Sequence, residues 1–231
     1  MVVTIHQPDF IPWLGFFDRW SKSDLLIILD DVQFLRRGWH HRDKIKTAHG
    51  VKWLTVPVKK KSRYYQKISE VEIDYHENWQ QSHFGIVKAA YSKAKNFDLV
   101  LDALTNIYSK NHRFLIDLNM DCLRYCAAQL SLDTPVLKAS SYSTKETKSR
   151  KLLELVSAVG GSAYLTGTGS KDYLDEKIFS EAGVEVTWQK YEHPIYPQFH
   201  GEFERMLSVL DYLMVSPRPY DILLQNGKFE I

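Results

Sequence analysis

The first segment able to do chemistry is His6-Gln7-Pro8-Asp9-Phe10-Ile11-Pro12-Trp13-Leu14-Gly15, which follows a short β-branched run and leads into a helical pattern. An imidazole and a carboxylate this close together can move a proton, and two prolines stiffen the loop that carries them. We therefore interpret His6 as a general base, chosen because histidine titrates nearest neutrality. Asp9 is a candidate for orienting it, and Gln7, Trp13 and Gly15 are expected to bind substrate. The alternative is a core histidine in a loop whose prolines only turn the chain.

A second polar cluster follows the apolar run from Leu25 to Leu29. Neighbouring parallel strands bring their carboxyl ends together, so Asp30 or Asp31 is expected near His6. Because consecutive residues of an extended chain point to opposite sides, only one of the two is expected in the site, and we take Asp31 as a second possible orienting carboxylate. The residues beyond it that are expected to bind substrate are Gln33, Trp39, Arg42 and Lys46. His40 and His41 have no third ligand at metal spacing, so no metal site is expected.

The third candidate is the small-residue stretch from Thr166 to Ser170, between a predicted strand and a predicted helix. Amides at a helix start attract anions, and glycines let a phosphate approach them, but the spacing matches neither the P-loop nor the dinucleotide fingerprint. If its strand neighbours the first strand at the switch point of a doubly wound sheet, this loop faces His6 across one cleft. The alternative is a turn capped by Ser170. The residues expected to hold phosphate here are Thr166, Gly167, Gly169, Ser170 and Tyr173.

The last polar stretch, Trp188 to Gln198, also follows a predicted strand. Its aromatic and amide side chains can wall a sugar or nucleotide pocket, and aromatic residues beside prolines equally often anchor a loop in the core. The candidates for substrate binding are Gln189, His193, Tyr196 and Gln198. Cys122 and Cys126 stand four apart in a helical stripe, a spacing that favours two core thiols over a disulfide or a nucleophile.

Composition and charge limit the classes of protein. The 231 residues are 44% hydrophobic and 25% charged, which excludes a disordered, collagenous or coiled-coil chain. No apolar run approaches the ~20 residues that span a bilayer, no secretion signal is visible, and a cytoplasmic protein is expected. Residues 36–67 hold eleven Lys and Arg against one acid, a net +10, while the rest of the chain carries −8. This basic section and its aromatic side chains can bind a phosphorylated metabolite, a nucleotide or RNA, although the tip Lys59 to Arg63, taken alone, is more typical of a solubilising turn.

The elements that must position these residues alternate between strand and helix at both ends of the chain. Residues 2–5 and 24–29 are predicted strands around a helix at 13–21, and the unbroken apolar run of the second strand indicates burial on both faces. After residue 134, strands at 135–138, 163–166 and 184–188 alternate with helices at 145–159 and 172–182, which predicts a parallel sheet, and a helix is predicted at 202–214. Between these parts, short strands at 32–34, 43–48 and 53–58 are followed by three helical segments, broken near 95–96 and 110–111.

The predicted fold class is therefore α/β, with a mostly parallel, doubly wound (Rossmann-like) sheet, a β insertion and a helical block. We expect one domain over residues 1–231, divided into an α/β core (1–31 and 134–231), a basic β-rich insertion (32–76) and a helical block (77–131). Two domains are the alternative. The tail after Pro217 has too little pattern to assign.

Six segments, in this order, resemble the WbqC-like family of bacterial proteins: IHQPDFIPWLGFFDRW, LDDVQF, RDKIKTAHGVKWLTVPV, YLTGTGSKDYLD, VTWQKYEHPIYPQ and LSVLDYL. Members of that family are encoded among genes for surface-polysaccharide (O-antigen) biosynthesis. The resemblance implies a role in making or modifying an activated amino sugar, with attachment of an amino acid such as glycine as one form of the reaction.

Three functions follow as hypotheses. The first is a cytoplasmic transferase acting on a nucleotide-linked or otherwise phosphorylated amino sugar. The second is a non-catalytic protein whose basic section binds RNA, such as an aminoacyl-tRNA, or a partner enzyme. The third is an ATP-dependent ligase or nucleotidylyltransferase; the sequence requires no cofactor, and ATP with magnesium is compatible with it. Nucleotidylyltransferases carry a His-x-Gly-His loop after their first strand, and the corresponding stretch here, Trp13-Leu14-Gly15-Phe16, lacks both histidines.

Overall fold

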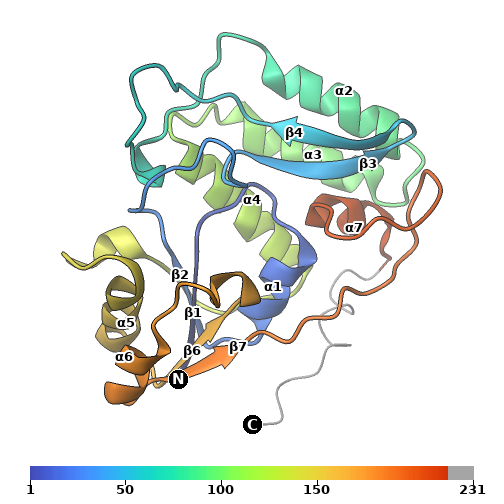
Figure 1. Cartoon of the computed structure of the whole chain (residues 1–231). Coiled ribbons are helices and arrows are strands. Elements are labelled where there is room, and N and C mark those ends of the chain that lie inside the picture. The colour runs from blue at the N-terminus through green and yellow to red at the C-terminus, as the bar shows by residue number, and fades with distance from the viewer. Residues whose placement is uncertain (218–231) are drawn as a thin grey trace.

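The computed structural model describes residues 1–217, and its centre is a five-stranded sheet whose neighbouring strands are all parallel (Figure 1). The order across the sheet is β5-β2-β1-β6-β7. The chain builds one half of the sheet outward from β1 and then returns to build the other half, which confirms the predicted Rossmann-like α/β fold. The strands are β1 (Val2–His6), β2 (Leu25–Ile28), β5 (Val136–Lys138), β6 (Ala163–Thr166) and β7 (Glu185–Trp188).

The reversal of strand order falls between β1 and β6. Thr4 pairs with Leu165, so the last residues of the two strands, His6 and Thr166, lie at the same edge of the sheet. Ligands of doubly wound sheets bind beyond the carboxyl ends of the strands at this reversal. Two loops leave this edge side by side: residues 7–13 after β1, here the entry loop, and residues 167–175 after β6, here the switch loop.

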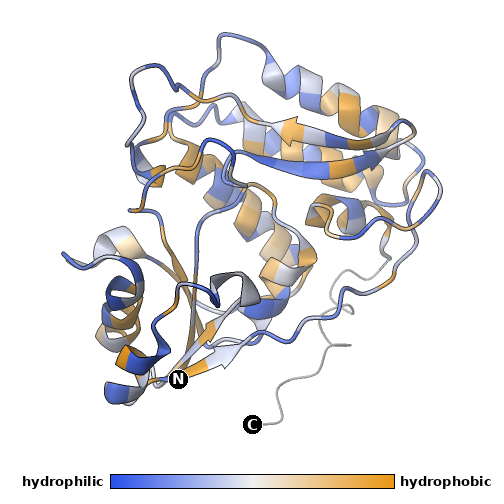
Figure 2. Ribbon diagram, viewed as in Figure 1, coloured by the Kyte–Doolittle hydropathy of each residue, from blue (hydrophilic) through white to orange (hydrophobic). Residues whose placement is uncertain are grey.

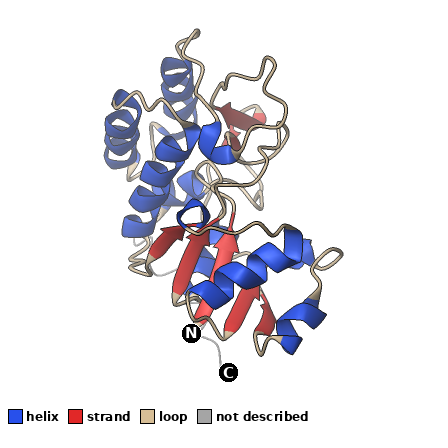
Figure 3. Cartoon of the chain, turned by 90° about the vertical axis from the view of Figure 1, so that its left-hand side faces the viewer, coloured by secondary structure: helices blue, strands red, loops and turns tan. Residues whose placement is uncertain are grey.

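Both faces of the sheet are covered, as the apolar run of β2 predicts. Leu26 and Ile28 pack in the larger hydrophobic cluster with α1 (Leu14–Ser21) and the helical block, whereas Leu25 and Ile27 pack in a smaller cluster with α5 (Lys148–Ala158) and α6 (Glu176–Glu181). Successive side chains of a strand alternate between faces, so four consecutive apolar residues are buried on both. Figure 3 shows the strands between these helices, with the helical block beyond one end of the sheet.

The insertion and the helical block have most of the elements expected of them. The insertion holds an antiparallel hairpin of β3 (Arg42–Thr47) and β4 (Gly50–Thr55), and the three helices that follow are α2 (Trp79–Tyr91), α3 (Phe97–Ser109) and α4 (Leu115–Gln129). The strand predicted at 32–34 is wrong, because this segment bonds only to the facing loop, through Phe34 to Gln66 and through Ile68 to Val32. Cys122 and Cys126 are buried and free in α4, as predicted.

Two predicted helices are shorter than their sequence pattern indicates. Residues 171–173 form a turn, so α6 begins at Glu176 instead of residue 172. The last described helix, α7 (Val209–Val215), begins after a serine cap, because Ser208 accepts a hydrogen bond from the Leu210 amide. The backbone at Gly201 and Met206 has positive φ, which a continuous helix over 202–214 does not allow.

In the insertion, β3 is drawn mostly in hydrophilic colours (Figure 2). Within residues 1–217 no helix is long and apolar enough to cross a membrane. That residues 1–231 make up a single domain stays a prediction, and its last residues, 218–231, lie outside the described part of the chain.

Candidate functional site

His6 stands at the end of β1, where its ring is held by the entry loop. Its Nδ1 lies 2.8 Å from the carbonyl oxygen of Gln7, and because a carbonyl only accepts, Nδ1 carries the proton and Nε2 keeps the lone pair. The ring meets Phe16 of α1 edge-on at 4.6 Å between centroids. A carboxylate oxygen of Asp9 lies 3.7 Å from Nδ1. The imidazole therefore has a fixed tautomer, a fixed orientation and one nitrogen able to accept a proton.

The pKa values of this pair are shifted in opposite directions. Burial, the positive charge of Arg19 and that of His40 lower the pKa of His6 to about 3. Burial raises the pKa of Asp9 to about 7, against the opposing effect of Arg19. Loss of solvation disfavours whichever form is charged, the imidazolium in one case and the carboxylate in the other. The reason given for His6 as base, titration near neutrality, is therefore wrong, and Asp9 is the group of the pair that titrates there.

The carboxylates after β2 have other partners. Asp31 forms an ion pair with Lys151 of α5, and Asp30 accepts hydrogen bonds from the backbone and hydroxyl of Ser140. Within the described chain neither acid contacts His6. The carboxylate that approaches the imidazole is Asp9, which belongs to the same loop.

The entry loop is tied to the insertion and to the helical block. The amide oxygen of Gln7 accepts a hydrogen bond of 2.6 Å from Nε2 of His40, and the Phe10 amide donates to the Trp39 carbonyl. Asn119 of α4, which is fully buried, donates to the carbonyls of both Pro8 and His40. The first two polar clusters of the sequence therefore meet through backbone and amide contacts rather than through the predicted acids.

On the other side of the entry loop, Trp13 folds back over the start of α1. A Cβ atom added to Gly15 would lie 2.3 Å from the indole ring, so the ring occupies the space that any other residue would need. Its other side meets the Tyr191 ring edge-on at 5.1 Å, and the His193 ring lies further along at 6.4 Å. His193 donates from Nδ1 to the Pro194 carbonyl, so it belongs to an aromatic wall of the loop rather than to a proton-transfer pair.

The switch loop returns to the same edge. The hydroxyls of Thr166 and Ser170 are 3.0 Å apart, and Ser170 donates to the Gly167 carbonyl. Gln189, one residue past β7, donates its backbone amide to Thr166 and its side-chain amide to Gly15 and Asp18. The switch loop, α1 and the stretch after β7 are thereby locked together beside His6.

The expected helix start behind the switch loop is absent. A single 3₁₀ turn, Thr168–Ser170, takes its place, and α6 is only six residues long. The dipole of a helix start therefore does not attract a phosphate here, contrary to the reason for choosing this loop. Gly169 and Tyr173 are exposed at its outer rim.

Arg19 supplies the positive charge at this edge, although nothing in its sequence motif singles it out. A Cβ atom on Gly167 would lie 2.5 Å from its Nη1, so the guanidinium packs directly on the backbone of the switch loop. A lone arginine in a helical pattern usually faces solvent. The signal that could have found it is the composition of α1, LGFFDRWS, because large apolar residues on all sides of a helix require that its charged residues be buried too.

Three predicted binding residues lie together elsewhere. Lys46 of β3 donates to Gln198 and to backbone carbonyls of residues 201 and 202, and the buried Tyr196 hydroxyl bonds to Gln198 and to Asp211 of α7. Their polar groups are taken up by internal hydrogen bonds. Lys46, Tyr196 and Gln198 therefore fix the chain after β7 against the hairpin.

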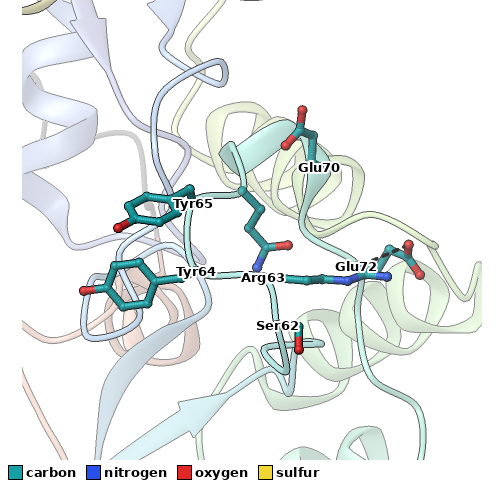
Figure 4. A pocket seen from close by; sticks show the side chains of 7 residues that line it. Ser62, Arg63, Tyr64, Tyr65, Glu70 and Glu72 are labelled. Carbon is teal, nitrogen blue, oxygen red and sulfur yellow. Dashed lines mark hydrogen bonds and ion pairs between the residues drawn. The ribbon is translucent and has the colours of Figure 1, made fainter.

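The remaining candidates belong to the outer surface of the insertion. Arg42 stacks on the half-exposed Trp53 ring, 4.4 Å from its centroid, and Trp53 meets Trp39 at 5.2 Å. Gln33 donates to the Tyr64 carbonyl. An open depression of about 690 Å³ lies nearby, lined by residues 62–66 with Glu70 and Glu72. Figure 4 shows the rings of Tyr64 and Tyr65 on one side of its loop and the Arg63–Glu72 ion pair on the other.

The fold and this edge define a class: an α/β protein with a doubly wound parallel sheet and a cluster of titratable and cationic side chains at its switch point. Residues 7–219 match the model of the WbqC-like protein family, and the chain belongs to that family. It is similar to the uncharacterized protein Rv1507c of Mycobacterium tuberculosis (strain H37Rv), with 36% identity over 213 residues, 91% of this chain and 92% of that protein. No solved structure matches. Within residues 1–217, no three His, Cys, Asp or Glu side chains gather in a way that could hold a metal ion.

Proposed function

We propose that this protein is a transferase that acts on a nucleotide-linked or phosphorylated amino sugar in bacterial surface-polysaccharide biosynthesis, attaching an acyl group such as glycyl to the sugar amine. The single observation that carries the proposal is that the His6–Asp9 pair and the Arg19–Gly167 contact lie at the carboxyl ends of the two strands that flank the switch point. Such a reaction requires a buried base that accepts a proton and a cation that neutralises an anion.

In this reaction the sugar amine attacks the carbonyl carbon of an activated acyl donor. A nitrogen–carbon bond forms, the bond between the carbonyl carbon and its leaving group breaks, and the amine loses one proton. The ionised Asp9 carboxylate takes that proton, because its pKa of about 7 makes it the stronger base of the pair. Neutral His6 accepts a hydrogen bond at Nε2 and orients the amine. Asp9 and His6 thus divide the role first given to His6 alone.

The test measures binding and turnover with the purified protein. Nucleotide-linked amino sugars, ATP with magnesium and bulk tRNA are compared by thermal shift at low and moderate salt, since a ligand raises stability according to its concentration over its Kd. We expect one nucleotide sugar to stabilise the protein at both salt concentrations. Acyl transfer to that sugar should fall about 10²–10⁴-fold in Asp9→Asn while binding persists. Stabilisation by ATP with magnesium and pyrophosphate release would replace this proposal with a nucleotidyl-transfer reaction.

A second candidate function is RNA binding by the insertion. Trp39, Trp53 and Tyr65 are 42%, 38% and 82% exposed, and cations lie over the first two rings. Exposed rings among basic side chains are the means by which proteins bind single-stranded RNA, such as the acceptor end of an aminoacyl-tRNA. Affinity for tRNA that falls steeply with salt and is lost in Trp39→Ala/Trp53→Ala would support it. Salt-independent affinity or an unchanged double variant would exclude it.

A further inference from the structure

Arg19 is a buried cation for which residues 1–217 supply no hydrogen-bond acceptor. It lies in the last turn of α1 and is 8% exposed, so it has lost most of its hydration. In residues 1–217 its guanidinium makes no hydrogen bond and no ion pair and is affected by Asp9 and Asp18 only through their charge, although a guanidinium carries five N–H donors. Arginine is almost never buried in this way unless it is paired. The missing acceptor points to a ligand.

The guanidinium is aimed at the switch point rather than into the core. Its Nη1 lies against the backbone of Gly167, at the place where any side chain on residue 167 would displace it. Its charge acts on His6 and Asp9 of the entry loop and on Tyr164 and Tyr173 around the switch loop. Arg19 therefore stands between the two loops that leave the ends of β1 and β6.

The neighbouring acids Asp18 and Asp9 form no direct ion pair with the Arg19 guanidinium. Asp18, the next residue on α1, is bound by Lys22 at 2.9 Å and by the Gln189 amide at 2.7 Å. Asp9 makes no ion pair with Arg19, and its pKa of about 7 means that it is only partly ionised at neutral pH. One positive charge at the switch point is left for an incoming anion.

We propose that Arg19 binds a phosphoryl group of the substrate between the carboxyl ends of β1 and β6, with its guanidinium donating to two phosphoryl oxygens. Guanidinium and phosphate match in a planar two-bond geometry, and an anion in this position removes the cost of a buried unpaired charge. This inference deepens the proposed function, and it rests on that function for the nature of the substrate. Binding of the phosphoryl group itself is measured without any transfer reaction.

The experiment titrates the full chain with inorganic phosphate, pyrophosphate and acetate by thermal shift and calorimetry. We expect pyrophosphate and phosphate to bind the wild type and acetate to bind far more weakly. In Arg19→Met, affinity for pyrophosphate should fall about tenfold or more, because a charge-assisted pair is lost. Without any anion, Arg19→Met should keep or raise the Tm of the wild type, since it removes an uncompensated buried charge.

Two further variants make the outcome decisive. Gly167→Ala keeps the arginine but fills the space of its Nη1, and it should also weaken pyrophosphate binding. Arg124→Met removes an exposed arginine of α4 and should change nothing. The proposal is overturned if Arg19→Met binds pyrophosphate as the wild type does, or if acetate binds as tightly as phosphate. If phosphate binding depends on Arg19 but no acyl transfer is detected, the proposed transferase function is excluded while the phosphate site is supported.

Discussion

The Oδ2 atom of Asp9 lies 3.7 Å from Nδ1 of His6, and the same buried loop moves the pKa of the acid up and that of the imidazole down. At neutral pH the pair is therefore an uncharged imidazole beside a carboxyl group near its midpoint. Such a pair can exchange one proton with a substrate without creating a second buried charge.

The first prediction concerns the pH dependence of turnover. If the Asp9 carboxylate is the base, the rate should rise with pH and level off above an apparent pKa of about 7. Asp9→Asn should lower the rate about 10²–10⁴-fold and abolish this rise, whereas His6→Gln should lower the rate and preserve it. Rate profiles of the three proteins between about pH 5.5 and about pH 9 test this. A rise that persists in Asp9→Asn assigns the titration to another group.

The second prediction concerns the anchor of the entry loop. Asn119→Ala leaves the buried carbonyls of Pro8 and His40 without their donor, and each unsatisfied group costs roughly 1–3 kcal/mol. We expect a loss of about 2–4 kcal/mol in the free energy of unfolding, measured by urea denaturation. Asn106→Ala, at an exposed position of α3, is the matched control. A loss no larger than that of the control would show that these two bonds do not hold the loop.

The third prediction concerns the close approach of Trp13 to Gly15. The Cβ atom of Gly15→Ala would lie 2.3 Å from the indole, so the ring must leave its position against Tyr191. A forced displacement of this kind costs roughly 1–3 kcal/mol of stability. The measurement is urea denaturation together with the near-ultraviolet circular dichroism of the aromatic side chains. Gly85→Ala, where an added Cβ meets nothing within 4 Å, is the control, and equal behaviour of the two variants would contradict the prediction.

The fourth prediction concerns stability against pH. Burial raises the pKa of Asp43 to about 8 and that of Asp9 to about 7, so between pH 4 and 8 the folded state binds more protons at these groups than the unfolded state. Their contribution to stability is therefore lost as pH rises through 7 and 8. Lowered pKa values of His6 and His41, both about 3, act in the opposite direction, because their neutral folded form is favoured as pH rises from 3 to 6.5. The two acids and the two histidines therefore nearly cancel between about pH 4 and 6.5, and stability should fall as pH rises from about 6.5 to 8.

Asp43→Asn tests the alkaline side of this curve. The amide stays neutral at every pH and can still accept the hydrogen bond from the Lys44 amide. We expect the Tm of Asp43→Asn to exceed that of the wild type at pH 8 by about 2–4 °C for each kcal/mol gained, and the gap to close toward pH 4. A Tm difference that does not change with pH would mean that Asp43 is not titrating in this range.

The fold could be predicted from local sequence patterns, and the structure contains the strands and helices that these patterns indicate. The unbroken apolar run from Leu25 to Leu29 is stable in water only as a strand whose two faces are both covered. The alternation of strands and helices after residue 134 allows little besides a parallel sheet. The lengths of α6 and α7 did not follow, because a turn at residues 171–173 precedes α6 and positive φ at His200, Gly201 and Met206 breaks the helical pattern before α7.

The candidate site was predictable only in part. The placement of His6 and Thr166 at one edge follows from strand order, and Asp9 follows from its closeness to His6 in the chain. The partner of Asp31, the internal use of Lys46 and the burial of Arg19 depend on long-range packing. A polar residue type indicates what a side chain can do, and only its neighbours in space decide whether its hydrogen bonds are already used.

The central strand also sets an order of assembly during synthesis. β1 can pair with β2 soon after both are synthesised, because they are close in the chain. The other edge of β1 can pair only after β6 has been made, since the hydrogen bond from Thr4 to Leu165 joins residues 161 positions apart. Closing so long a loop is slow, while the hairpin and α2 to α4, whose contacts are local, can form as soon as they are made. Arg19 contacts the backbone of Gly167 only after β6 has paired with β1. A chain released early from the ribosome would carry a folded insertion and helical block beside an open sheet edge, and no place for a phosphate.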